Sequence, residues 1–470
     1  PEGGFSPFTA SGETVTFTLT DSTVITVEGT DGSSEGTADD ITVGSILELT
    51  LDEENQALTV TVQNTMPGGG GQPGGGFGGS SEVTNGTSAN TIDEDSEIES
   101  ETYTSDGDDE NALRVDGADV TLTDITVEKT GGASSNTENG DFYGQNAGLL
   151  ALNGAQVTIT GANVTTDAQN GNGVFSYGEG TVVNISDSTI RTSKDNSGGI
   201  QTTGGGTTNA SNLDVETQGN SSAAIRSDRG GGTVQVDGGT YVTNGTGSPA
   251  VYSTADVTVA NAELTANASE GVVVEGKNSV SLTDCDVTGN MTGTYQGDED
   301  ENIHNIMIYQ SMSGDAEVGE ASFSAEGGSI TARSGDMFYV TNTDCTITLK
   351  NVAFTLANEV FLRVEGNSGR RGWGTEGENG GDVVLNASGQ EIEGKILVDE
   401  ISSLALSLTE GSSFTGAVNP DGEGGEVAVT LSADSTWTLT GDSYISSFEG
   451  SADNIVSGGY HLYVNGEQLV

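Results

Sequence analysis

The feature that most constrains this chain is a repeat of 22 to 26 residues that begins near Glu82. Six apolar positions hold equivalent places in successive repeats, and subtracting their numbers gives spacings of 25, 26, 24, 26 and 22 residues. These positions are Leu149, Val174, Ile200, Ala224, Ala250 and Val272. Periods of about 20–50 residues are typical of solenoids, propellers and other arrays.

Each repeat contains three short β-branched segments separated by Gly, Asn, Asp or Thr, as in "GVVVEGKNSVSLTDCDV" (271–287). A propeller blade needs roughly 40 residues, and a leucine-rich repeat needs a helical half that this pattern lacks. Three strands per repeat make one turn of a parallel β-helix, whose turns stack to share one core. Because crossovers between parallel strands are nearly always right-handed, the sequence predicts an all-β, right-handed parallel β-helix of about a dozen coils.

The same alignment predicts the columns of the core, in which equivalent side chains of successive coils stack. The first column is expected to contain Leu150, Phe175, Gln201, Ile225, Val251, Val273, Met307, Phe338 and Leu362. The second contains Val157, Val183, Val234, Val257, Val280 and Val383, and the third Ile159, Ile185, Val236, Val259, Leu282 and Leu385. Gln201 interrupts its column, so either the register slips there or an internal hydrogen bond satisfies the amide. Cys285 and Cys345 fall at different positions in their coils and are expected to be buried thiols.

Composition divides the chain into four segments. Residues 1–65 alternate apolar and polar positions, which predicts a small N-terminal β-barrel or β-sandwich. Residues 66–81 are glycine-rich and are expected to be a flexible linker. Residues 82–440 carry the repeat, and residues 441–470 lose it and are expected to cap the open end of the β-helix.

Charge excludes two classes of partner. The sequence has 71 Asp and Glu against 13 Lys and Arg, a formal net charge of −58, so nucleic acid and anionic membranes are repelled. No apolar run approaches the ~18 residues needed to cross a bilayer, and no membrane insertion is expected. Few Cys and Lys with many Thr, Ser, Asn, Asp and Gly favour a secreted bacterial surface protein. The start at Pro1 fits a processed, mature chain.

Insertions interrupt the repeat at residues 131–147, 288–304 and 366–382. In solenoids, insertions become loops that often lie on the binding face. The third insertion carries Arg370, Arg371 and Trp373, which are residue types enriched at binding hot spots. The alternative is structural, with an internal ion pair for the arginines and Trp373 covering an edge of the core.

An outward column on the first strands is the second candidate binding surface. Arg226, Tyr252, Tyr339 and Arg363 would decorate it, and aromatic rings and planar guanidiniums suit sugar or peptide surfaces; the alternative is plain structural surface. The whole expected column is Arg114, Ala151, Ser176, Thr202, Arg226, Tyr252, Val274, Ile308, Tyr339 and Arg363. Arg229, at the glycine-rich corner "DRGGG", is expected to pair with Asp228 or with a carboxylate one coil away.

Catalytic and metal motifs are incomplete. The tripeptide 342–344, "NTD", matches the first motif of polygalacturonases, but the rest of that signature is missing and no pair of carboxylates suits glycoside hydrolysis. We therefore expect no enzyme activity, a polysaccharide lyase being the alternative. No cofactor or metal is expected, and Ca²⁺ at the acidic run 298–301 is the alternative to a solvated loop. His304 and His461 are too far apart in the repeat to share a zinc site.

Four segments carry a resemblance to a known family. They are "AAIRSDRGGGT" (223–233), "IYQSMSGDAEVG" (308–319), "FYVTNTD" (338–344) and "NSGRRGWGTEGENGGD" (367–382). The chain resembles, over roughly residues 100–440, uncharacterised secreted right-handed parallel β-helix proteins of Gram-positive bacteria that are labelled adhesins or carbohydrate-binding-domain proteins. This resemblance implies a β-helix at a cell surface and supplies no catalytic residues.

The leading functional prediction is an extracellular or cell-surface, adhesin-like protein that binds a glycan or a surface protein through one lateral face and its loops. A structural subunit that self-associates end to end into a filament or surface layer is the alternative, and a polysaccharide lyase is the third hypothesis.

Overall fold

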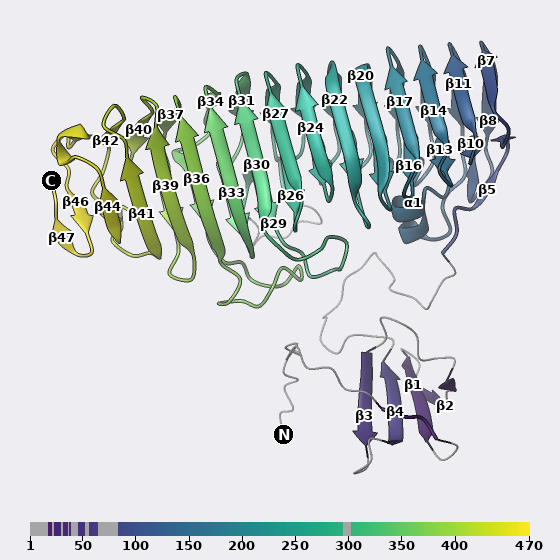
Figure 1. The fold of residues 1–470 in the computed structure, drawn as a ribbon, viewed down its shortest axis with the longest axis horizontal. Coiled ribbons are helices and arrows are strands. Elements are labelled where there is room, and N and C mark those ends of the chain that lie inside the picture. Colours follow the sequence, from purple (N-terminus) through teal and green to yellow (C-terminus); the bar gives the residue numbers. More distant parts are fainter. Residues whose placement is uncertain are drawn as a thin grey trace. The chain divides into compact units, whose positions relative to one another are not determined.

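The computed structural model describes residues 17–20, 23–29, 32–35, 37–38, 46–51, 56–63, 83–294 and 302–470. The chain divides into two compact units, Pro1–Glu82 and Val83–Val470, whose elements are labelled in Figure 1. The glycine-rich segment 66–81 and the acidic run 298–301, with their predicted roles as linker and as loop or calcium site, lie outside the described residues.

The described strands of the first unit form one four-stranded sheet. Its order is β2 (Gly32–Glu35), β1 (Val24–Gly29), β4 (Ala57–Gln63) and β3 (Ile46–Leu51). β1 and β4 are parallel, whereas the two outer pairs are antiparallel. Val60 and Val62 of β4 are fully buried. They lie two residues apart, as on the covered face of a strand. Closure of this sheet into a barrel or sandwich stays a prediction.

The second unit is a solenoid of stacked parallel strands, which confirms the predicted parallel architecture (Figure 1). One sheet has 12 strands and takes one strand from each successive repeat. Its strands are β6 (Thr91–Ile92), β10 (Leu113–Asp116), β13 (Leu149–Leu152), β16 (Val174–Tyr177), β19 (Ile200–Thr203), β21 (Ile225–Ser227), β23 (Val251–Ser253), β26 (Val272–Glu275), β29 (His304–Tyr309), β32 (Asp336–Thr341), β35 (Val360–Val364) and β38 (Lys395–Val398).

A second sheet has 22 strands and takes two strands, or one long bent strand, from most repeats. Its strands are β7 (Ser96–Glu99), β8 (Thr102–Ser105), β11 (Asp119–Thr123), β12 (Thr126–Lys129), β14 (Gln156–Thr160), β15 (Asn163–Thr166), β17 (Val182–Ser186), β18 (Thr189–Thr192), β20 (Gly206–Thr217), β22 (Gly232–Thr243), β24 (Asp256–Ala260), β25 (Glu263–Ala266), β27 (Ser279–Thr283), β28 (Asp286–Gly289), β30 (Ala321–Glu326), β31 (Ser329–Ala332), β33 (Thr343–Lys350), β34 (Ala353–Thr355), β36 (Gly381–Ser388), β39 (Ser403–Thr409), β41 (Glu426–Leu431) and β44 (Ser447–Glu449).

Short sheets complete the two ends of the solenoid. At the start, β5 (Thr87–Ser88) pairs with β9 (Glu110–Asn111). Towards the end, a four-stranded sheet contains β37 (Glu391–Glu393), β40 (Ser413–Gly416), β42 (Thr436–Leu439) and β45 (Ile455–Val456). The last sheet contains β43 (Ser443–Ile445), β46 (Leu462–Val464) and β47 (Glu467–Gln468), and the 3₁₀ helix η3 (Ala452–Asn454) precedes β45. β46 and β47 pair antiparallel, so the parallel stacking stops there.

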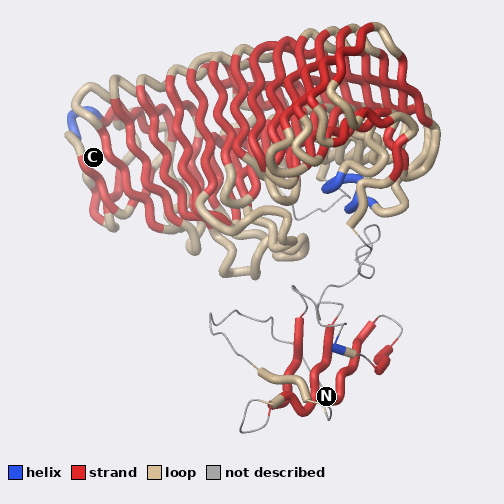
Figure 2. Tube along the Cα trace, turned by 45° about the vertical axis from the view of Figure 1, so that its right-hand side comes forward, coloured by secondary structure: helices blue, strands red, loops and turns tan. Residues whose placement is uncertain are grey.

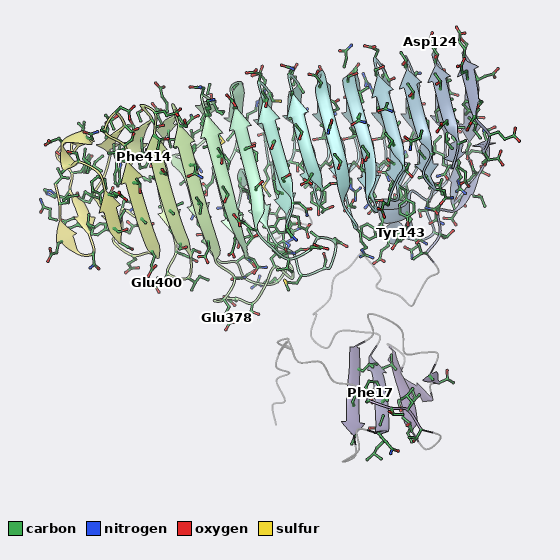
Figure 3. All side chains as sticks on the ribbon, in the orientation of Figure 1. Phe17, Asp124, Tyr143, Glu378, Glu400 and Phe414 are labelled. Carbon is green, nitrogen blue, oxygen red and sulfur yellow. The ribbon has the colours of Figure 1, made fainter. Side chains whose placement is uncertain are left out.

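The bend within each repeat of the 22-stranded sheet explains the recurring Asp, Asn and Gly. At least one residue at each of these bends has positive φ, a conformation that Gly, Asn and Asp adopt most readily. Asp124, labelled at the upper edge of the solenoid in Figure 3, is one of these residues. The residues at successive bends are Asp124, Gly161, Asp187, Asn212, Gly238, Asn261 and Asp284, with φ between 47° and 73°. Side-chain bonds join neighbours in this row, such as Asn212 Nδ2 to Asp187 Oδ1 at 2.6 Å.

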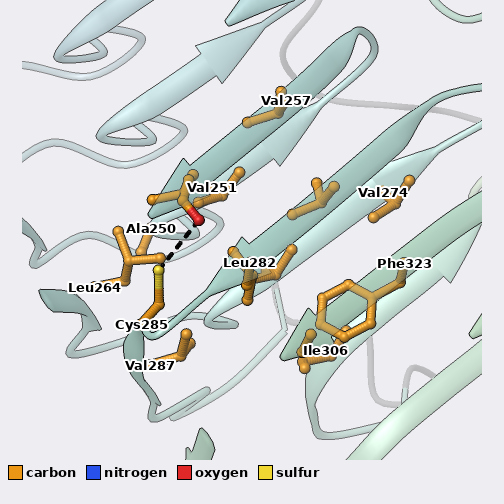
Figure 4. Packing of buried hydrophobic residues seen from close by; sticks show 14 of the residues in the cluster. Ala250, Val251, Val257, Leu264, Val274, Leu282, Cys285, Val287, Ile306 and Phe323 are labelled. Atoms are coloured by element: carbon orange, nitrogen blue, oxygen red, sulfur yellow. Dashed lines mark hydrogen bonds between the residues drawn. The ribbon is translucent and has the colours of Figure 1, made fainter. Parts of the chain in front are cut away.

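The core is continuous from the first repeats to the last. The second and third predicted columns form over most of their length; Val157 pairs with Val183, and Val257 with Val280. Figure 4 shows this packing around Val257, Leu282 and Cys285. Cys285 and Cys345 are both buried and free, which confirms that prediction. The Cys285 thiol donates to the carbonyl oxygen of Val259 at 3.3 Å.

The predicted register of the 12-stranded sheet is wrong by one residue in several coils. The inward column is Leu113, Leu149, Val174, Ile200, Ile225, Val251, Val272, Ile306, Phe338, Leu362 and Ile396. Leu150, Phe175, Gln201, Val273 and Met307, which were expected inside, share instead the outward column of Arg226. Ala151, Ser176, Thr202, Val274 and Ile308, expected outside, face the core. The error arises because both faces of these strands are buried, so polar alternation gives no register.

A second register error concerns β36. Leu385 pairs with Ile347, so it lies in the column that was predicted for Val383. Val383 itself pairs with Cys345, two positions earlier. β33 and β36 each have eight residues where β14 has five, so they contribute an additional inward position near the start of the strand.

A short helix in the first insertion is absent from the sequence prediction. α1 (Thr137–Tyr143) begins at Asn136, whose side chain accepts from the Asn139 amide at 3.1 Å, and ends at Gly144 with φ 72°. This N-cap and left-handed C-cap are the usual sequence signals for helix ends. Among the described residues, no helix has the length and apolar character needed to cross a membrane.

Candidate functional site

A cavity of about 270 Å³ lies on the outward face of the 12-stranded sheet. Its lining comes from all three insertions predicted from the sequence. Residues 131–147 provide Asp141 and Phe142 of α1, residues 288–304 provide Met291 and Gly293, and residues 366–382 provide Arg371 and Trp373. Figure 2 shows loops and α1 gathered along one side of the stacked strands. Segments far apart in the chain thus meet at one site.

The floor of the cavity is a row of four paired residues. Arg226 of β21 pairs with Tyr252 of β23, which pairs with Val273 of β26 and then with Met307 of β29. Because parallel strands stack about 4.8 Å apart, the row runs along the solenoid axis with one side chain per coil. One end of this floor is charged and the other apolar.

Arg226 is held between two carboxylates at the charged end. Its Nε lies 2.7 Å from Asp228 Oδ2, and its Nη2 lies 3.4 Å from Asp141 Oδ2. All three side chains are at least nine-tenths buried, yet each lines the cavity. Gln201 Nε2 also donates to Asp228, at 2.9 Å. We call Arg226, Asp141 and Asp228 the ion triad.

Asparagines of successive repeats hold α1 in place over this row. Asn170 Nδ2 donates to Asp141 Oδ1 at 2.9 Å, and Asn196 Nδ2 donates to Asp141 Oδ2 at 3.1 Å. Both asparagines have positive φ, 55° in each case. The turn that allows this conformation therefore also positions the amide that orients Asp141.

Burial sets the protonation of the two carboxyls in the ion triad. It raises the pKa of Asp228 to about 7, against the lowering effect of the Arg226 guanidinium, and the charge of Asp141 adds to the rise. Burial likewise raises the pKa of Asp141, although Arg226, Asn196 and Asn170 act in the opposite direction. The site therefore holds a carboxyl that titrates near neutral pH.

A third buried carboxyl, that of Glu275, lies at the end of β26, two residues after Val273 of the floor. Glu275 accepts hydrogen bonds from the hydroxyls of Tyr252, Ser311 and Tyr309, the last at 2.8 Å. Burial raises the pKa of Glu275 despite these donors, and burial also raises the pKa of Tyr252 and Tyr309 well above the usual value for tyrosine. The rings of Tyr252 and Tyr309 are thereby fixed in orientation.

Glu270 is the carboxylate of the cavity that favours ionisation. Its Oε1 lies 3.4 Å from His304 Nε2, and Ser269 donates to its Oε2. Burial opposes its charge, but the contacts with His304 and Ser269 outweigh burial and hold the pKa of Glu270 below its usual range.

Aromatic and guanidinium groups form the wall opposite α1. The Trp373 and Tyr309 rings pack edge to face with centroids 4.9 Å apart. The Arg371 guanidinium lies over the Trp373 ring, 4.5 Å from its centroid. Glu378, farther along the same insertion, projects away from the solenoid in Figure 3.

The structure brings four of the seven predicted site residues to the cavity. Arg226, Tyr252, Arg371 and Trp373 line it, whereas Arg370, Tyr339 and Arg363 do not. Tyr339 shares the outward column but is buried, with its ring centroid 5.1 Å from that of His304.

Arg363 continues the column one strand farther and is occupied by ion pairs. Its Nε lies 2.5 Å from Asp336 Oδ2, and its Nη1 lies 3.1 Å from Glu365 Oε2. Both predicted arginines are thus held by two carboxylates, and they differ in that Arg226 lines the cavity whereas Arg363 does not.

The ion-pair partner predicted for Arg229 is wrong. Arg229 reaches Asp315 Oδ1 at 2.8 Å and Glu138 Oε2 at 3.7 Å, and its guanidinium lies 4.1 Å from the Phe142 ring centroid. It therefore links Glu138 of α1 to Asp315, in the segment between β29 and β30, and does not pair with Asp228. The glycines after it do make the predicted corner, since Gly230 and Gly231 have φ of 85° and 56°.

Several residues of the site escaped the sequence analysis. Asp141, Asp228, Glu270, Tyr309 and Asp315 all line the cavity. Asp228 was visible in "AAIRSDRGGGT", two residues after Arg226, which is the spacing of neighbours on one side of an extended strand. Tyr309 ends β29 and lies in the repeat, whereas Asp141, Glu270 and Asp315 lie outside the strands, where the repeat alignment carries no information.

No metal centre accompanies the cavity in the described part of the chain, where no three His, Cys, Asp or Glu side chains are arranged to hold an ion. Asn342 of the "NTD" tripeptide has φ 53° and donates from Nδ2 to the Gln310 carbonyl at 2.7 Å; it forms a bend between β32 and β33, and Thr343 and Asp344 begin β33.

Comparison with known proteins gives no relative: no family model, curated protein or solved structure matches this chain.

Proposed function

We propose that the protein is an extracellular, adhesin-like binding protein that holds a saccharide in the cavity above the ion triad, and that its solenoid is a right-handed β-helix of about a dozen coils displayed at a bacterial surface. The observation that carries this proposal is the cavity of about 270 Å³, in which aromatic rings face buried charged groups. Ligand sites typically combine apolar walls with a few fixed polar groups.

The aromatic side chains supply the apolar part of such a site. Tyr252, Tyr309 and Trp373 line the cavity, and Glu275 and the Trp373–Tyr309 contact hold their rings. Fixed rings lose little conformational entropy on binding, so the C–H faces of a sugar can pack on them at low cost. The carboxylates and the guanidinium provide acceptors and donors for hydroxyl groups.

The hydrogen bonds of the ion triad favour binding of a glycan over its cleavage. Asp141 accepts from two asparagines and Arg226, and Asp228 accepts from Gln201 and Arg226. Glycoside hydrolysis needs one carboxyl free to donate to the leaving oxygen and another free to act on the opposite side. Carboxyls held in this way by neighbouring donors are not free to take these two roles.

Charge also favours the binding hypothesis over a lyase. Lyases act on acidic polysaccharides, which the net charge of −58 repels. The cavity adds Asp141, Asp228, Glu270 and Asp315 to that repulsion.

A glycan array at physiological salt tests the proposal. We expect the intact chain to bind a limited set of saccharides, and Trp373→Ala to weaken that binding at least about tenfold, as for a central aromatic anchor. Tyr460→Ala is the matched control, because Tyr460 is exposed and does not line the cavity. A blank array for wild-type protein, or equal losses in both variants, would overturn the proposal.

A further inference from the structure

We infer that the saccharide carries a free ammonium group, as in an amino sugar, and that this group binds beside Asp228 in the ion triad. The inference rests on the proposed function, since it specifies the sugar that the same cavity takes.

The first support is the charge balance inside the cavity. Its lining contains four carboxyl side chains and two guanidiniums, a difference of two negative charges: Asp141, Asp228, Glu270 and Asp315 against Arg226 and Arg371. Glu270 and Asp315 have cationic or ionisable neighbours outside the lining, His304 and Arg229. Among the described residues, the ion triad has no further cationic partner and keeps two carboxyls for one guanidinium.

The second support is a shortage of hydrogen-bond donors at the same place. Gln201 is fully buried and gives its amide nitrogen to Asp228 and to the Asp141 carbonyl oxygen. Its Oε1 has no hydrogen-bond partner within the part of the chain that is described. Buried acceptors without donors are costly. Gln201 bonds to Asp228 but does not line the cavity, so an ammonium group beside Asp228 would bring its three donors and its positive charge to the carboxyls of the ion triad.

The third support is that the walls already accommodate cations. The Arg371 guanidinium lies 4.5 Å from the Trp373 ring centroid, and Arg229 lies 4.1 Å from that of Phe142. Both rings line the cavity. Aromatic faces near carboxylates attract cations, and desolvation inside a cavity strengthens that attraction.

Proton exchange links the ligand to Asp228. Five groups face this carboxyl: Arg226, Asp141, Asp315, Tyr252 and Gln201. With its pKa raised to about 7, Asp228 is partly protonated at neutral pH and the excess negative charge is partly relieved. A bound ammonium favours the ionised carboxyl, so binding at a pH below about 7, where the sugar amine is itself charged, releases a proton from Asp228, and affinity increases with pH until the amine loses its own proton.

A matched pair of disaccharides tests the inference by calorimetry at about pH 6 and 0.15 M salt, where Asp228 is mostly protonated and the sugar amines are charged. β-1,4-linked diglucosamine and its N,N′-diacetyl form share a backbone and differ in the ammonium groups. We expect wild-type protein to bind the diglucosamine at least about tenfold more tightly and to release a proton, seen as a binding heat that depends on buffer ionisation. Asp228→Asn should bring the preference near unity.

Asp119→Asn is the control for non-specific attraction to an acidic protein. Asp119 is exposed on β11, and this substitution removes a carboxylate that does not line the cavity. It should leave the preference unchanged. If Asp228→Asn fails to fold, proton release by the wild-type protein still decides the question. Equal binding of the two disaccharides, a preference for the acetylated form, or equal effects of the two variants would overturn the ammonium inference. If neither disaccharide binds while neutral glycans bind on the array, the inference fails and the proposed function stands; if no glycan binds, both fail.

Discussion

The outward faces of the two long sheets differ in what covers them. On the 22-stranded sheet, β14 alternates exposed and buried residues, and its outward side is Thr and Gln in contact with solvent. On the 12-stranded sheet, β13, β19 and β29 are buried along their whole length, although alternate residues point away from the core. The same solenoid thus has one bare face and one face covered by inserted segments.

The difference shows where a solenoid can build a site. Each coil alone presents a nearly flat strip, and a concave surface arises only where an insertion folds back over that strip. α1 covers the outward column at one end and residues 366–380 cover it at the other, and the cavity is the gap between them.

Phe175→Ala should have the largest effect. Phe175 points away from the core yet is fully buried against Leu150 and Leu152. Its loss should lower the free energy of unfolding by about 3–5 kcal/mol, as for a core phenylalanine. Thr158→Ala, on the exposed outward side of β14, should change it by no more than about 0.5 kcal/mol. Urea unfolding measures both, and a Phe175→Ala cost below about 1 kcal/mol would show that the covered face is not a second core.

Arg226→Ala should cost about 3 kcal/mol, because it leaves Asp141 and Asp228 buried without their cation. A variant that makes the whole ion triad neutral, Arg226→Met with Asp141→Asn and Asp228→Asn, should recover part of the loss. If the triple variant is the less stable of the two, uncompensated charge is not the cause.

Stability should depend on pH through Asp228. The pKa of Asp228 is about 7 in the folded protein, against 3.8 for the free side chain in the unfolded chain. Between pH 3.8 and about pH 7 the folded state therefore binds more protons than the unfolded state. The contribution of Asp228 to the free energy of unfolding therefore falls as the pH rises from about 4 to about 7. The difference between wild type and Asp228→Asn, followed by urea unfolding across this range, isolates that contribution from those of other carboxyls. A difference that stays constant with pH would contradict the raised pKa.

The smallest effect is expected on the bare face. Arg191 Nη2 lies 2.5 Å from Asp214 Oδ2, and both side chains are well exposed to solvent. A double-mutant cycle with Arg191→Ala and Asp214→Ala should give a coupling of no more than about 1 kcal/mol, reduced further in high salt. A coupling as large as the Arg226→Ala effect would remove the contrast between the two faces.

The sequence predicts the solenoid well because its repeats are a local signal. Val157 and Val183 stack as expected, since each repeat places a β-branched residue between polar ones on the 22-stranded sheet. The same reasoning misplaces Phe175 and Met307, because covering segments bury their face and erase the polar alternation. Sequence order alone does not show that α1 returns over β19 and β21.

The candidate site is predictable only in part for the same reason. Arg226 and Tyr252 were found because they occupy equivalent places in adjacent coils. Trp373 was predicted as a site residue because Trp is enriched at binding hot spots. Asp141 and Asp315 come from segments without a repeat, and only the folded chain shows that they face Arg226 and Arg229.

α1 also changes how the solenoid resists being pulled apart. In a simple solenoid each coil holds only its neighbours, so coils can peel away one at a time from an end. α1 bonds to several successive coils at once: Asn170 Nδ2 reaches Asp141, Gln201 Nε2 reaches the Asp141 carbonyl, and Thr203 Oγ1 reaches the Phe142 carbonyl at 2.6 Å. Arg226 extends the bridge by one more coil. These coils are therefore expected to unfold together as one cooperative unit. Tension along the chain must then break several hydrogen bonds at once before the coils beside the cavity separate.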